Sequence, residues 1–135
     1  MKKVLQFMFI SIVLLQFSCS KENDEIDSKS LKGMWVHTGT KTDTIDFNSK
    51  MFTSGKTFEL KRGKEIWNGY ELPKTGSGFY TYEIKTDSIY LRDMISSAGG
   101  SLFYFKLDPD KKSFEIASFA PFTGGLMVNK FRKIK

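Results

Sequence analysis

The chain has 135 residues, a length that fits one small domain. Its 21 basic and 15 acidic residues give a formal net charge of +6, and no block of five like charges occurs, so a nucleic-acid-binding patch is not indicated. The single cysteine and the single histidine exclude an internal disulfide and a zinc site built from these two residue types. Thirteen phenylalanines and five tyrosines favour strands over helices.

The chain begins with a segment typical of exported proteins. Residues 1–3 (Met-Lys-Lys) are basic, and the mostly apolar run 4–17 that follows is too short to span a membrane. The lone Cys19 comes directly after this run, with the small Ser18 before it. This arrangement resembles a bacterial lipoprotein signal, which implies that Cys19 carries the lipid, including palmitate-type acyl chains, and becomes the first residue of the mature chain. Gln16 replaces the Leu that usually stands three residues before the Cys, and a plain secretory peptide is the alternative.

A charged cluster lies directly behind Cys19. It consists of Lys21, Glu22, Asp24 and Glu25. The cluster resembles the surface-export signal of Bacteroidota lipoproteins, which implies a lipid-anchored protein of the outer membrane that faces the cell exterior. Acidic residues crowd next to the cysteine while the rest of the chain is basic, which favours an export signal over the alternative, an ordinary polar tether.

From Leu31 onward, turn signals recur at short and regular spacing, the pattern of a meander of short strands. Alternation of apolar and polar residues, as at Ile45 and Phe47, predicts strands with one buried face. The predicted strands are 33–38, 43–48, 51–54, 56–61, 65–68, 79–85, 88–93, 102–107, 113–119 and 126–134. Gly, Pro and polar residues predict loops or turns at 69–78, 96–100, 108–111 and 121–125. No 15-residue segment keeps a period of 3.6, so almost no helix is expected after the leader.

The first and the last predicted strands carry the residues on which a family resemblance rests. Gly33 and Trp35 open the first strand, and Arg132 lies near the end of the last. A Gly-x-Trp opening with a closing Arg resembles the lipocalin-like (calycin) barrels, here in a lipoprotein of the kind found in Bacteroidota. The resemblance implies an all-β domain, a small antiparallel up-and-down barrel of eight strands, with Trp35 plugging its closed end and Arg132 lying across the indole ring. A β-sandwich is the alternative.

These features divide the chain into three parts. They are a lipoprotein signal peptide at 1–18, the lipidated cysteine with an acidic tether at 19–30, and a lipocalin-like β-barrel at 31–135. The expected partner of the anchor is the membrane.

A set of aromatic residues is the candidate ligand-lining site. The set comprises Trp67, Tyr80, Tyr82, Phe103, Phe105 and Phe114. Such side chains could line a cup that holds an apolar ligand. The alternative is that they fill the barrel, because an interior of eight strands is about wide enough for side chains or for one small ligand.

The sequence shows no arrangement typical of catalysis. His37 is expected to be a half-exposed strand residue, and the Gly-rich segment 76–78 precedes a strand rather than the helix that a phosphate-binding loop needs. We therefore expect no enzyme, cofactor, metal or nucleic-acid partner. The predicted function is an outer-membrane or surface lipoprotein that binds a small hydrophobic ligand, and the alternative is a non-catalytic module that docks on an envelope protein complex or an extracellular polymer.

Overall fold

The computed structural model describes residues 26–48, 56–122 and 127–135, and almost all of this part of the chain is β-structure. The elements are α2 (Ser28–Leu31), β1 (Met34–His37), β2 (Thr44–Asp46), β3 (Thr57–Lys61), β4 (Lys64–Trp67), β5 (Tyr70–Pro73), β6 (Gly78–Ile84), β7 (Ser88–Asp93), β8 (Ser101–Leu107), β9 (Ser113–Ala117) and β10 (Val128–Lys133). The strand predicted at 51–54 lies outside the described residues.

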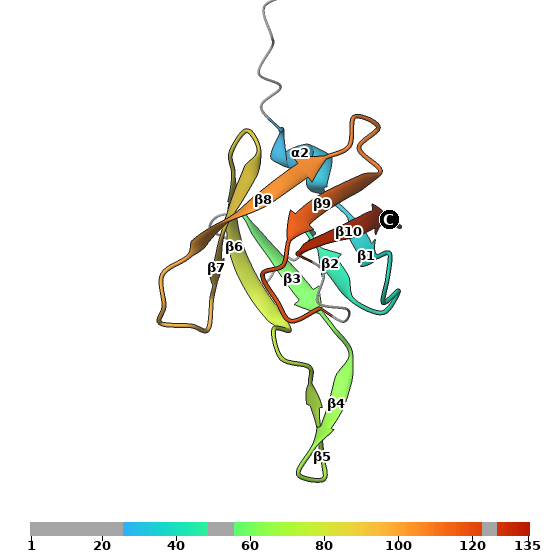
Figure 1. Cartoon of the computed structure of the whole chain (residues 1–135), viewed down its shortest axis with the longest axis vertical. Helices are drawn as coiled ribbons and strands as arrows, with labels where there is room; N and C mark the ends of the chain where they lie inside the picture. Colours follow the sequence, from blue (N-terminus) through green and yellow to red (C-terminus); the bar gives the residue numbers. More distant parts are fainter. Residues whose placement is uncertain (1–25, 49–55, 123–126) are drawn as a thin grey trace, which may run out of the picture.

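Eight strands form one closed antiparallel barrel in the order β1-β10-β9-β8-β7-β6-β3-β2 (Figure 1). The order follows the chain, except that β4 and β5 are inserted between the paired strands β3 and β6 as a separate two-stranded sheet. Pairing of β1 with β10 closes the barrel and gives every one of its strands two neighbours. The structure thus confirms the predicted eight-stranded barrel, and the sandwich alternative is wrong.

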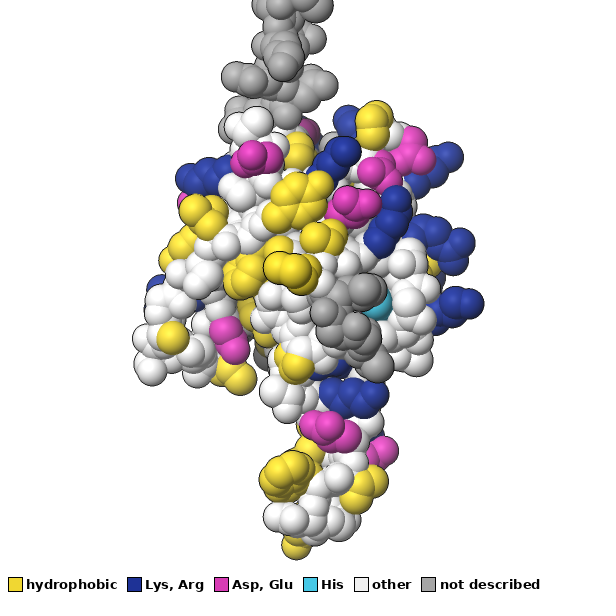
Figure 2. All heavy atoms as spheres, in the orientation of Figure 1, with side chains coloured by type: hydrophobic (Ala, Val, Ile, Leu, Met, Phe, Trp, Pro, Cys, Tyr) yellow, Lys and Arg dark blue, Asp and Glu magenta, His cyan; other side chains and the backbone are white. Residues whose placement is uncertain are grey.

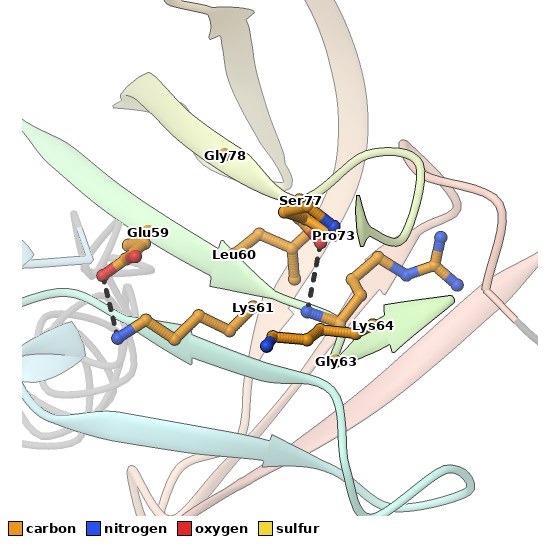
Figure 3. Close-up of a pocket in the computed structure, with 9 residues that line it drawn as sticks. Glu59, Leu60, Lys61, Gly63, Lys64, Pro73, Ser77 and Gly78 are labelled. Atoms are coloured by element: carbon orange, nitrogen blue, oxygen red, sulfur yellow. Dashed lines mark hydrogen bonds and ion pairs between the residues drawn. The ribbon is translucent and has the colours of Figure 1, made fainter. Parts of the chain in front are cut away.

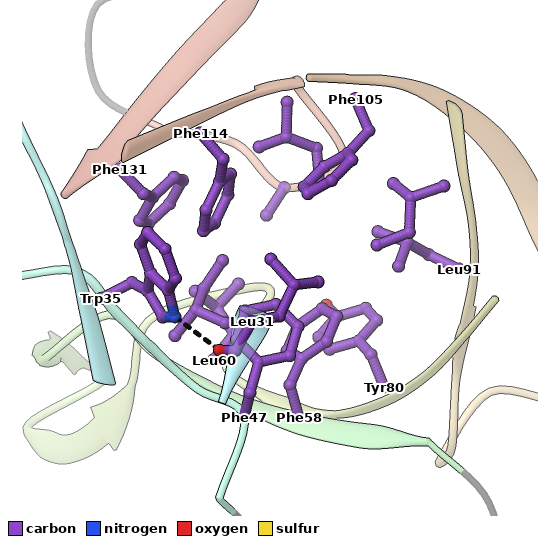
Figure 4. Close-up of a cluster of buried hydrophobic side chains, with 14 of the residues drawn as sticks. Leu31, Trp35, Phe47, Phe58, Leu60, Tyr80, Leu91, Phe105, Phe114 and Phe131 are labelled. Carbon is purple, nitrogen blue, oxygen red and sulfur yellow. Dashed lines mark hydrogen bonds between the residues drawn. The ribbon is translucent and has the colours of Figure 1, made fainter. Parts of the chain in front are cut away.

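The predicted alternation places the apolar residues of the barrel strands inside. Phe58 and Leu60 of β3, and Phe114 and Ile116 of β9, are each at most 2% exposed. Figure 4 shows labelled side chains from around the wall directed towards the interior. Full burial of a side chain of this size contributes about 1.5–3 kcal/mol, so this set is the main source of stability.

Trp35 closes the end of the barrel at which α2 lies. Its side chain is fully buried, and the indole Nε1 donates a hydrogen bond to the Leu31 carbonyl oxygen at 2.8 Å (Figure 4). The ring centroid lies 4.9 Å from that of Phe114. Asp27 caps the helix by accepting a hydrogen bond from the backbone N–H of Lys29 at 3.0 Å. The short helix therefore presents both an apolar side chain and a carbonyl acceptor to the tryptophan.

The cation over Trp35 is Lys133, and the prediction of Arg132 for this role was wrong by one residue. The register pairs Trp35 with Lys133 and Val36 with Arg132. Because successive side chains of a strand point to opposite faces, Arg132 points outward and is exposed, while Lys133 Nζ lies 5.2 Å from the ring centroid of Trp35. Gly33 has φ +124°, and a Cβ there would lie 2.0 Å from the Lys135 carbonyl oxygen, so the close approach of Lys135 to the residue before β1 requires glycine.

The prediction of a loop over 69–78 was wrong, because this segment contains β5. Tyr70 pairs with Trp67, and the pairing ends with Pro73 opposite Lys64. The hairpin projects from the end of the barrel opposite α2 (Figure 1). Pro73 is tolerated because it is the last residue of a strand with only one neighbour in the described sheet.

Candidate functional site

Within the described residues, the β4–β5 hairpin exposes four large apolar side chains outside the barrel. Ile66, Trp67, Tyr70 and Leu72 are 71%, 65%, 72% and 45% exposed. Hydrophobic side chains are visible at the end of the hairpin in Figure 2. Trp67 was predicted to line a ligand cup inside the barrel, and this prediction was wrong because its strand is not part of the barrel.

A tight turn shapes the hairpin. Asn68 and Gly69 have φ values of +49° and +82°, which define a two-residue turn of the I′ type. Because residues that face each other in the register share a face of the sheet, Trp67, Tyr70 and Leu72 lie on one face. Ile66 lies on the other face with the Lys64–Glu71 ion pair, whose charged atoms are 2.7 Å apart. One face is thus an aromatic platform, and the other mixes apolar and charged groups.

A hollow of about 370 Å³ lies at the base of the hairpin (Figure 3). Its lining includes Pro73 and Lys64 of the hairpin, Gly63 between β3 and β4, and Gly78 at the start of β6. A Cβ at either glycine would meet nothing within 4 Å, so the hollow stays open beside these backbone positions. The hollow is continuous with the hairpin face that carries Ile66, since Lys64 and Pro73 belong to that face.

Arg62 fixes the base of the hairpin to the barrel. Its side chain is buried, and its guanidinium donates hydrogen bonds to the carbonyl oxygens of Thr75 and of Pro121, the latter at 2.7 Å. Nε lies 3.5 Å from the buried Asp43 carboxylate, and Cζ lies 5.3 Å from the ring centroid of Phe122. One side chain therefore joins the hairpin base to two other loops at this end of the barrel.

Arg62 and Asp43 form a buried polar cluster that also includes His37, whose backbone N–H donates to the Asp43 carbonyl oxygen. The prediction that His37 is half-exposed was wrong, because its side chain is 2% exposed. Its Nδ1 accepts a hydrogen bond from the Thr40 backbone N–H at 2.9 Å, so the proton of the neutral ring lies on Nε2, which faces Asn129 Oδ1 at 3.2 Å. The ring also stacks on Phe122, with centroids 5.5 Å apart. These contacts make His37 part of the packing that closes this end of the barrel.

Sequence reasoning missed this cluster, although one signal was present. Arg62 continues the phase of Phe58 and Leu60, both of which are buried, so alternation alone directs it inward. Its partner Asp43 has the phase of Ile45 and Phe47, which are also buried, so alternation within the predicted strand 43–48 directs it inward as well.

The other predicted ligand-lining residues lie on the inner face of the barrel. Phe105 and Phe114 are fully buried with ring centroids 5.3 Å apart, and Phe103 is half-buried. The Tyr80 hydroxyl donates to the Gly76 carbonyl oxygen at 2.8 Å. Burial raises the pKa of Tyr82 to about 12 and also raises that of Tyr80, to which the Asp93 carboxylate adds while Arg62 acts in the opposite direction.

The predicted anchor and export residues lie outside the described part of the chain. They are Cys19, Lys21, Glu22, Asp24 and Glu25. Among the described residues, no group of three or more His, Cys, Asp or Glu side chains is placed to hold a metal ion. The helix in the described ranges is too short to cross a membrane. Comparison of the chain with protein-family models, with curated proteins and with solved structures gave no significant match.

Proposed function

We propose that this protein is a lipid-anchored, non-catalytic interaction module that docks on another protein through its β4–β5 hairpin. The observation that carries the proposal is the exposure of Ile66, Trp67, Tyr70 and Leu72 on an element that contributes nothing to closing the barrel. A two-stranded hairpin is marginally stable in water by itself. The exposure of Trp67 and Tyr70 on such a hairpin is accounted for if a partner protein covers these two rings in the complex.

The size of the hairpin surface supports an interface. A buried aromatic side chain contributes about 150–250 Å², and Trp67 and Tyr70 keep 65% and 72% of their surface exposed. Together with Leu72 on the same face, they present roughly 400 Å² of side-chain area, about half of the about 800 Å² that each partner contributes to an interface of standard size. Trp and Tyr are enriched among residues that dominate binding energy, and aliphatic neighbours favour an apolar protein surface over a hydrated polymer.

The position of the hairpin suits a protein anchored near its N-terminus. The chain enters the barrel at α2, and the hairpin projects from the opposite end (Figure 1). Segment 20–26 reaches at most about 25 Å when fully extended. A lipid on Cys19 would therefore keep the α2 end near the membrane and direct the hairpin away from it, and export through Glu22, Asp24 and Glu25 would place it outside the cell.

A photo-crosslinking residue in place of Trp67 tests the docking role in cells. We expect a crosslinked protein adduct whose yield falls at least tenfold when Tyr70→Ala and Leu72→Asp are added on the same face. The matched control carries the crosslinker at Ile95, which is 82% exposed on the loop between β7 and β8. Equal adducts from both positions, or adducts that ignore the two substitutions, would contradict the proposal, and capture of a polysaccharide would replace the protein partner by a polymer.

Binding of a small apolar ligand is the second candidate function. It is favoured by half-buried aromatic side chains that pack against the core without being fully covered, among them Tyr82 and Phe103 on barrel strands and Phe119 in the segment after β9. Native mass spectrometry of the full chain purified from its membrane would show a bound mass that Phe103→Ala removes. Absence of any such mass at all expression levels would contradict this function.

A further inference from the structure

We infer that the turn of the hairpin is a site of spontaneous covalent modification, at which Asn68 converts to aspartate and isoaspartate by reaction with the backbone nitrogen of Gly69. The inference goes beyond the proposed function, because it concerns the chemistry of the turn itself and needs no partner. Of the four asparagines in the chain, Asn68 is the one that a glycine follows. Since glycine has no Cβ, its backbone nitrogen is open to close approach by the preceding side chain.

Both residues of the turn lie apart from the rest of the molecule. Asn68 and Gly69 are exposed at the free end of the hairpin (Figure 1). Within the described residues, neither the Asn68 side-chain amide nor the Gly69 backbone N–H has a hydrogen-bond partner. A Cβ at Gly69 would meet nothing within 4 Å. The two reacting groups are therefore neither engaged by other groups nor covered by them.

The hairpin opens at this turn more easily than the barrel opens. A two-stranded sheet is marginally stable in water by itself, and β4 and β5 pair only with each other in the described sheet. Local opening of such an element needs far less free energy than unfolding of the core. Once the turn opens, rotation of the Asn68 backbone brings its side-chain Cγ to the Gly69 nitrogen.

The reaction needs water and neither an oxidant nor a reductant. The Gly69 nitrogen attacks Cγ of Asn68, so an N–Cγ bond forms and the Cγ–Nδ2 bond breaks. The proton of the Gly69 nitrogen leaves with Nδ2 as ammonia, and a succinimide ring remains. Water then opens the ring at either carbonyl carbon. Addition at Cγ gives aspartate, and addition at the main-chain carbonyl carbon gives isoaspartate, in which the backbone runs through Cβ and Cγ.

Isoaspartate at this position disrupts the pairing of the hairpin. The two-residue turn fixes the register that places Trp67 opposite Tyr70. Isoaspartate adds one main-chain carbon and one negative charge, so the segment no longer fits a turn of this type. The barrel is not affected, because β4 and β5 form a sheet of their own. The modification therefore disorders the face that carries Trp67 and leaves the barrel folded.

Asn129 is a control within the same chain. It is fully buried on β10, which pairs with both β1 and β9, and its Oδ1 lies 3.2 Å from Nε2 of His37. Ring closure at Asn129 requires the barrel itself to open. The fold thus protects Asn129 and leaves Asn68 unprotected.

Incubation of the full chain, purified from its membrane, at mildly alkaline pH tests the inference. Peptide mapping by mass spectrometry follows the loss of each side-chain amide, in the folded chain and in the chain unfolded by urea. We expect folding to slow the conversion of Asn68 less than tenfold and that of Asn129 more than a hundredfold. Asn68→Gln, whose side chain would have to close a larger ring, should give no product at this position over the same period.

Hydrogen exchange tests the effect on the hairpin. In the fraction that contains isoaspartate, we expect the backbone amides of 64–73 to exchange at least tenfold faster than in the fresh chain, with those of β9 and β10 unchanged. If folding slows the conversion of Asn68 tenfold or more, the turn holds the reacting groups apart and the inference is wrong. If exchange over 64–73 is the same in both fractions, the loss of register is wrong.

Discussion

The closed end of the barrel and the projecting hairpin each hold one of the two tryptophans, in opposite environments. Trp35 is fully buried, hydrogen-bonded to Leu31 and packed against Phe114, whereas Trp67 is 65% exposed and pairs across the hairpin with Tyr70. Both stand in short antiparallel strands with aromatic neighbours. What differs is the sheet to which each belongs. A closed barrel shields the inner face of its strands from solvent, whereas an isolated two-stranded sheet shields neither of its two faces. Residue type and local strand structure therefore do not decide whether a ring stabilises the fold or is available to a partner.

Replacing each tryptophan gives the largest expected difference between the two regions. Trp35→Ala removes a fully buried ring and should lower the free energy of unfolding by about 4 kcal/mol. Trp67→Ala, the matched control, should lower it by less than about 1 kcal/mol, because the ring is mostly exposed. Urea unfolding followed by far-ultraviolet circular dichroism measures both. Equal losses would mean that the hairpin is part of the cooperative core.

Arg62 tests the junction between the two regions. Arg62→Met leaves the buried Asp43 carboxylate without its counter-charge and leaves the Thr75 and Pro121 carbonyl oxygens without a donor, so we expect a loss of about 3 kcal/mol. Adding Asp43→Asn should recover part of this loss. A double substitution that is as unstable as Arg62→Met, measured by the same urea titration, would show that the carbonyl contacts rather than the charge pair dominate.

Lys133 and Arg132 test how the closed end is covered. Lys133→Ala should cost about 1 kcal/mol, because it removes a cation 5.2 Å from the Trp35 ring, whereas Arg132→Ala should cost less than about 0.5 kcal/mol. A double-mutant cycle with Trp35→Phe should show coupling for Lys133 and none for Arg132. Coupling of Trp35 with Arg132 but not with Lys133 would instead support the contact between Arg132 and the Trp35 ring that the family resemblance implies.

Tyr82 has the smallest expected effect at neutral pH, and its contribution changes only at high pH. Its folded-state pKa of about 12 lies above the ordinary value of 10.0, because burial penalises the phenolate. The stability that the neutral phenol contributes is fully present below about pH 10 and is lost as the pH rises towards 12. Tyr82→Phe should remove this decline, which urea unfolding at several pH values would reveal, and should remove one ultraviolet-detected phenol titration step near pH 12. An unchanged titration would mean that another tyrosine accounts for that step.

The barrel strands could be predicted from the sequence because the alternation of apolar and polar residues that identifies them lies within each strand. Alternation identifies the inward residues of a strand wherever one face is covered, as at Phe58 and Leu60 or Phe114 and Ile116. The prediction of a strand at 65–68 was confirmed as β4, but β5 was missed because Pro73, Gly76 and Gly78 indicate a loop. A local signal was present, since Asn68-Gly69 between Trp67 and Tyr70 is typical of a two-residue hairpin turn.

The candidate site was harder to predict because it depends on pairing between distant segments. Whether Arg132 or Lys133 faces Trp35 is set by the register of β1 against β10, and a shift of one residue exchanges them. Arg62 meets groups from Asp43 and from Pro121, far away along the chain. Trp67 was placed inside because an aromatic residue in a predicted strand was assumed to belong to the barrel, and only the topology shows that it does not.

The separate environments of the two tryptophans give this protein a pair of intrinsic fluorescent reporters. An indole in contact with water emits at longer wavelength than one in an apolar interior, so the exposed Trp67 and the buried Trp35 contribute resolvable bands. A Trp67→Phe variant would report only on the closed end of the barrel, and a Trp35→Phe variant only on the hairpin. Quenching by acrylamide would then follow occupancy of the hairpin without any added label.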